Sequence, residues 1–160
     1  MIQIVKDTRP WFFLQTTHST YGMRVMETGH LEHLYYGERI TVDTQDSAFC
    51  APLVIQRGFA PGNTCTYDRE HPQISMEDVC LEVGTLGKGD IREPFLEVRF
   101  ADGSVTTDFT FDSYEVITLK EREQCLQDSG LPHSYSEAET DSAECLQIIL
   151  QDVTNHLELQ

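Results

Sequence analysis

Hydrophobic side chains recur at every second position along most of this chain, which is the period of a β-strand. Near the end, Leu146, Ile148 and Leu150 keep this spacing, and Leu157 and Leu159 resume it. No segment shows a convincing amphipathic pattern with the period of a helix. A series of short strands separated by turn residues predicts an all-β fold. A β-sandwich is the form in which such strands bury one common core.

Turn residues mark where the expected strands end. Gly29 can take a positive φ without steric cost, and Asp102-Gly103 between two alternating runs is typical of a β-hairpin. Residues 121–127 have some helical character. We expect strands at residues 2–4, 11–16, 21–25, 31–36, 95–100, 105–111, 114–119 and 144–160.

The stretch from residue 38 to residue 89 breaks the alternating pattern. It contains prolines and glycines, among them Pro52, Gly58, Pro61 and Gly62. A structureless connection of this length is uncommon inside a compact domain. We therefore expect one long irregular loop region that is functional, ordered by a partner, or divided by short elements. Long loops on β scaffolds are where binding residues tend to lie.

The charge of the chain limits its classes of partner. Its 160 residues suit a single domain, numbered 1–160, that can bury a sizeable core. The formal net charge is −16, from 27 acidic and 11 basic residues. Phosphate backbones and anionic membranes need a positive patch, so we expect no nucleic-acid and no membrane partner. A neutral ligand such as a sugar is compatible with this charge.

The five cysteines are an odd number, and no two of them form a C-x-x-C pair. Such spacing favours neither a zinc site nor a disulfide framework, so we expect free thiols in the cytoplasm and no metal or other cofactor. The N-terminus lacks a basic region followed by an apolar core, and no apolar run is long enough to span a membrane.

Short motifs that identify a reaction are missing from the sequence: it has no glycine-rich phosphate loop, no H-E-x-x-H and no G-x-S-x-G. His30 and His33 are three residues apart, which on a regular strand places them on opposite faces and makes them poor co-ligands of a metal. Tyr35 and Tyr36 are adjacent, so one faces the core and the other faces outward, where it covers a neighbouring strand or stacks against a sugar. Trp11 is expected in core or domain-interface packing.

Four segments together carry a resemblance to a known family. They are YGMRV at 21–25 followed by GHLEHLYYG at 29–37, GDIREP at 89–94, DGSVTTDF at 102–109 and GLPHSY at 130–135. In order and spacing they resemble the N-terminal domain of bacterial α-galactosidases of glycoside hydrolase family 36, over essentially the whole chain. The resemblance implies a β-sandwich that is part of a large supersandwich. It also implies a catalytic (β/α)8 barrel and a small C-terminal β-domain in the same polypeptide.

The family implied is one of retaining glycosidases that hydrolyse terminal α-galactosides such as melibiose or raffinose. Its nucleophile and its acid/base are both aspartates of the barrel, so the resemblance assigns no catalytic residue to this chain and predicts that the chain alone is inactive. It implies three partners: the barrel of the same polypeptide, neighbouring subunits of a homo-oligomer, and the galactoside.

A loop between Phe49 and Tyr67 is implied to reach toward a neighbouring subunit's active site. The run QRGF at 56–59 resembles the substrate-proximal segment of the family, which makes Gln56 and Arg57 the candidate site residues. Some members have an aspartate where Gln56 stands. Glutamine can donate and accept hydrogen bonds, but it offers no charged acceptor.

The strand pattern continues to Gln160 without a closing turn or a polar tail. We therefore expect the chain to be part of a longer protein. Two other interpretations stay open. One is a freestanding β-sandwich that binds carbohydrate by itself, and the other is an assembly domain that contacts no ligand.

Overall fold

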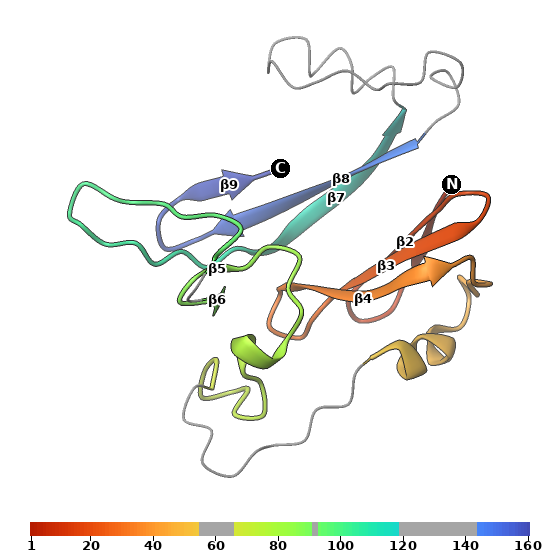
Figure 1. The fold of residues 1–160 in the computed structure, drawn as a ribbon, viewed down its shortest axis with the longest axis horizontal. Coiled ribbons are helices and arrows are strands. Elements are labelled where there is room, and N and C mark those ends of the chain that lie inside the picture. The colour runs from red at the N-terminus through yellow and green to blue at the C-terminus, as the bar shows by residue number, and fades with distance from the viewer. Residues whose placement is uncertain (55–65, 91–92, 119–143) are drawn as a thin grey trace.

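The computed structural model describes residues 1–54, 66–90, 93–118 and 144–160. Within these ranges the chain forms two antiparallel sheets and one very short strand pair, β5–β6 (Figure 1). The first sheet has the order β1 (Ile2–Val5), β2 (Trp11–Gln15), β3 (Ser19–Val25), β4 (Leu31–Glu38). The second has the order β7 (Thr110–Thr118), β8 (Glu144–Asp152), β9 (Leu157–Leu159).

The two sheets share one hydrophobic core, as the alternating pattern predicts. Phe12 of β2 is fully buried, and its ring centroid lies 5.1 Å from that of Tyr114 and 6.3 Å from that of Phe111, both on β7. Val25 and Leu31 from the first sheet and Leu150 from the second complete the buried contacts. This arrangement confirms the predicted all-β sandwich.

The opposite face of the first sheet is also covered. Phe13 is as deeply buried as its neighbour Phe12, although the two side chains project to opposite faces. It packs with Val5 and Cys50 under the 3₁₀-helix η1 (Ser47–Leu53), which lies beside the first sheet in Figure 1. Trp11 packs against the same cluster, which confirms the expected core role. A strand covered on both faces explains why β2 is apolar in consecutive positions.

The described part of the 38–89 region is divided by short elements, which is one of the three outcomes expected. Besides η1 it contains η2 (Met76–Asp78), β5 (Thr85–Leu86) and β6 (Gly89–Asp90). Residues 80–82 run along the free edge of β4, where the His33 amide donates to the Cys80 carbonyl and the Glu82 amide donates to the Leu31 carbonyl. Elements of two or three residues are too short to show a period. No helix among the described residues is long and apolar enough to cross a membrane.

The hairpin expected around Asp102-Gly103 is only partly correct. The turn forms, since Gly103 has a φ of 88° and the Phe100 amide donates to the Ser104 carbonyl. However, residues 97–100 and 104–109 have no regular strand ladder, so the two predicted strands are wrong there. The runs 105–111 and 114–119 instead meet in the single strand β7, whose register shifts between Phe111 and Ser113. A bulge inserts one extra residue into a strand, so a single continuous strand shows an interruption in the alternating sequence pattern.

Candidate functional site

The two candidate site residues, Gln56 and Arg57, lie outside the residues that the structure describes, as do residues 121–127 with their expected helical character. What the structure does describe is the chain on either side of residues 55–65. On one side this is η1, and on the other it is the segment that begins at residue 66.

The preceding segment is held to the first sheet by packing, and a helix cap orders the start of η1. Asp46 accepts a hydrogen bond from the Ala48 amide at 2.8 Å, which satisfies one free N–H at the start of η1. The ring of Phe49 lies 5.7 Å from that of Phe13. Burial raises the pKa of the Cys50 thiol to about 11, so this cysteine is a packing residue and not a nucleophile.

The following segment is held by a polar cluster centred on Asp108. His30 Nε2 lies 2.8 Å from Asp108 Oδ1, the Tyr67 hydroxyl donates to Asp108 Oδ2 at 3.1 Å, and Lys88 Nζ lies 3.2 Å from the same Oδ2. The Lys88 ammonium also lies 4.5 Å from the centre of the Tyr67 ring, a cation–π contact. We call these four residues the Asp108 cluster. It joins the turn before β4, the segment after residue 65, the β5–β6 turn and the approach to β7.

The charge of the Asp108 cluster is balanced internally. Burial raises the pKa of Asp108, but the hydrogen bond from His30 and the positive charge of Lys88 outweigh it and hold that pKa below its usual range. Burial and the neighbouring carboxylate raise the pKa of Tyr67 to about 12, so its hydroxyl stays protonated and donates. A carboxylate with three partners is positioned to hold chain segments together.

Sequence reasoning did not identify Asp108 as a structural centre. The sequence did indicate that both residues matter, because His30 and Asp108 each lie inside a segment that carries the family resemblance. What was missing was their proximity, since 78 residues separate them in the chain. His33 contacts a different carboxylate, Glu82, so the two histidines share no ligand. Among the described residues, no group of three or more metal-ligating side chains comes together.

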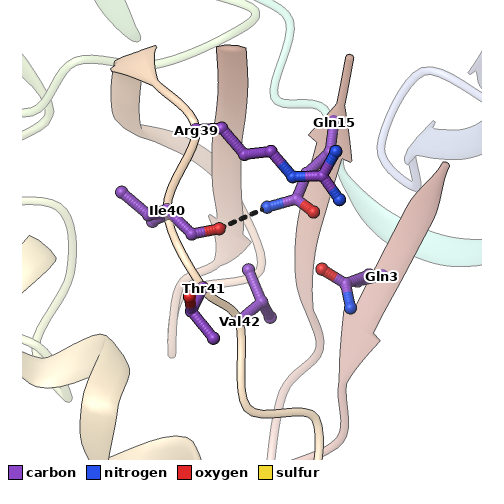
Figure 2. Close-up of a pocket in the computed structure, with 6 residues that line it drawn as sticks. All are labelled: Gln3, Gln15, Arg39, Ile40, Thr41 and Val42. Atoms are coloured by element: carbon purple, nitrogen blue, oxygen red, sulfur yellow. Dashed lines mark hydrogen bonds between the residues drawn. The ribbon is translucent and has the colours of Figure 1, made fainter. Parts of the chain in front are cut away.

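A polar pocket opens on the face of the first sheet opposite β7–β9, between β1, β2 and the segment that follows β4 (Figure 2). Its volume is about 280 Å³, near the lower end of the range for small-molecule sites. Figure 2 shows the guanidinium of Arg39 extending over the Gln15 carboxamide toward Gln3. Gln15 is fixed, since its Nε2 donates to the Ile40 carbonyl at 2.7 Å and to Thr20 Oγ1 at 3.1 Å.

This Arg39 pocket can bind a small polar ligand, but it cannot carry out acid/base chemistry. Its lining offers amides, a hydroxyl and one guanidinium, and no carboxylate. Glycoside hydrolysis of the retaining type needs two carboxyl groups on either side of the bond. Neither the Arg39 pocket nor the Asp108 cluster provides that pair.

Comparison with known proteins gives a family for most of the chain. Residues 29–160 match the model of the glycosyl hydrolase family 36 N-terminal domain. The bifunctional alpha-galactosidase/sucrose kinase AgaSK of Mediterraneibacter gnavus is 34% identical over 99% of this chain and 16% of its own length. The alpha-galactosidase AgaA of Geobacillus stearothermophilus is 30% identical over 92% of this chain and 18% of its own length. The chain thus spans less than a fifth of each relative.

A solved structure agrees with this match. The crystal structure of the alpha-galactosidase from Lactobacillus brevis superimposes with a TM-score of 0.72 and 27% identity, covering 96% of this chain and 19% of that protein. Because it covers 96% of the chain, this agreement in fold extends beyond residues 29–160, which the family model matches. The chain therefore belongs to the N-terminal domain family of glycosyl hydrolase family 36.

Proposed function

We propose that this chain is the N-terminal β-sandwich of a retaining α-galactosidase that hydrolyses terminal α-galactosides such as melibiose or raffinose. The observation that carries the proposal is the family match over residues 29–160. In this proposal the catalytic barrel and a C-terminal β-domain belong to the same polypeptide, outside these residues. The sandwich packs on the barrel and supports a homo-oligomer in the cytoplasm.

Two features of the structure support a positioning role for this domain. The chain before residue 55 and the chain after residue 65 are each attached to the sandwich, by η1 and by the Asp108 cluster. A loop attached at both ends has less conformational freedom to lose when it contacts a substrate. We propose that Gln56 and Arg57 use this arrangement to approach a galactoside in a neighbouring active site.

The test is hydrolysis of melibiose by two preparations, made in a host without α-galactosidase. One is the full protein encoded by the reading frame that contains this chain, and the other is the 160-residue chain alone. We expect the full protein to release galactose and the chain alone to match buffer, because the acid/base pair lies elsewhere. Turnover by the chain alone contradicts the proposal, as does a full protein without activity on any α-galactoside.

Replacing Arg57 with alanine tests the loop separately. In the full protein we expect Arg57→Ala to raise KM by about tenfold, roughly 1.4 kcal/mol, with kcat nearly unchanged. The reason is that a residue that contacts the sugar equally in the ground state and in the transition state contributes to affinity but not to the rate of the chemical step. Arg69→Ala is the control, since Arg69 is exposed and lies outside residues 55–65. If the two variants have equal KM values, Arg57 does not contact the substrate.

A further inference from the structure

A group of aromatic and polar side chains on β3 and β4 has no role in the function proposed above. Tyr36, near the end of the edge strand β4, is a large ring that is 73% exposed. Its ring centroid lies 6.1 Å from that of Tyr21, and the ring of Tyr21 lies 4.9 Å from the imidazole of His33. The carboxylate of Glu82 contacts both, accepting from the Tyr21 hydroxyl and lying 3.1 Å from His33 Nδ1.

A bulge in β4 brings these side chains to one face. Tyr36 pairs with Tyr21 and Tyr35 pairs with Gly22, but the next residue of β3, Met23, pairs with His33. Leu34 is therefore the extra residue. On a regular strand His33 and Tyr36 project to opposite faces; the bulge places them on the same face, beside Tyr21. Bulges that redirect a side chain in this way are enriched next to functional sites.

Glu82 reaches this face because residues 80–82 extend the sheet along β4. Burial and the bond to Glu82 raise the pKa of Tyr21, which keeps its hydroxyl protonated and donating. Glu82 is consequently held in place while remaining a hydrogen-bond acceptor. Next to it a cavity of about 320 Å³ is lined by residues of the 79–84 segment, by Glu93 and by Phe95, a ring that is 70% exposed.

We propose that Tyr36, Tyr21, His33 and Glu82 form a binding site for a pyranoside, separate from the catalytic centre. The exposed ring of Tyr36 offers a flat surface for the C–H face of a sugar, and Glu82 and His33 offer hydrogen-bonding groups for its hydroxyls. A neutral ligand also avoids repulsion from a chain with a net charge of −16. A protein partner is the less favoured occupant, because fixed polar groups border the exposed ring.

The test is a titration of the 160-residue chain with methyl β-D-galactopyranoside, followed by NMR shifts of backbone amides. This sugar is not an α-galactoside, so the result does not depend on the proposed enzyme activity. We expect shifts centred on β3, β4 and residues 80–82. Galactitol, which has similar hydroxyls but no ring, is expected to bind at least tenfold more weakly. Failure of the sugar to produce localised shifts overturns the proposal and leaves the α-galactosidase assignment untouched.

Single substitutions test which side chains bind the sugar. Tyr36→Ala is expected to weaken the sugar by about tenfold, and Glu82→Gln, which keeps the shape but removes the charge, by a smaller factor. Val153→Ala is the matched control, because Val153 has the same 73% exposure but lies in the β8–β9 turn. If Tyr36→Ala changes self-association in sedimentation but not the sugar titration, the surface is a protein contact and the proposal is wrong.

Discussion

Replacing Phe12 with alanine should remove about 4 kcal/mol from the free energy of unfolding, within the range of about 3–5 kcal/mol typical of buried phenylalanines. Phe12 is fully buried and is the side chain through which the first sheet meets Phe111 and Tyr114 of the second. The sheets cannot close over the vacated volume without shifting the whole β7–β8 pair. Urea unfolding followed by circular dichroism measures the change.

The control for this experiment is the same substitution at an exposed ring. Phe95 is 70% exposed, so Phe95→Ala should change stability by no more than about 0.5 kcal/mol. A loss of 3 kcal/mol or more is a large part of the roughly 5–15 kcal/mol that stabilises a typical domain. If the two variants unfold at similar urea concentrations, the sheets do not share the core described here.

Replacing Asp108 with asparagine should cost about 2 kcal/mol at neutral pH. The change keeps the size of the side chain but removes the charge that Lys88 and His30 contact, and hydrogen bonds to charged groups contribute roughly 1.5–3 kcal/mol. The Asp108 side chain is 27% exposed, so solvent weakens these interactions only in part. Loss of this carboxylate should also release the segment that begins at residue 66, making it more sensitive to proteolysis.

The pH dependence gives this prediction a second measurement. The pKa of folded Asp108 lies below its unfolded value of about 3.9. Its contribution is therefore complete above the unfolded pKa and is lost as the pH falls through the folded pKa. Asp108→Asn should unfold with a flatter pH dependence in acid than the original chain. Asp112→Asn, at an exposed position on β7, is the control and should keep the original slope.

The class of fold could be predicted from the sequence because burial on one face of a strand imposes a period of two. Strands β1 to β4 were predicted close to their observed bounds, whereas a turn divides the single strand expected at residues 144–160 into β8 and β9. The turn at Gly29 was also correct, with a φ of 89°. These features depend on residues within a few positions of one another, so local sequence contains the necessary information.

The errors in the fold have a common cause. Around Asp102-Gly103 the sequence alternates, but no neighbouring strand in the described part of the chain pairs with residues 97–100 and 104–109. In β7 the bulge between Phe111 and Ser113 made one strand look like two. In β4 the bulge at Leu34 put His33 and Tyr36 on the same face, which spacing alone could not indicate. Pairing with a partner strand decides each of these points.

By itself, the sequence determined that this protein is an all-β sandwich of an identifiable family, because periodicity and short motifs are properties of neighbouring residues. The tertiary structure alone decided which polar side chains meet. Asp108 contacts His30, Tyr67 and Lys88, at separations of 78, 41 and 20 residues along the chain. Glu82 reaches Tyr21 across 61 residues. Such contacts depend on how the strands and loops pack in space, and no local pattern in the chain encodes that packing.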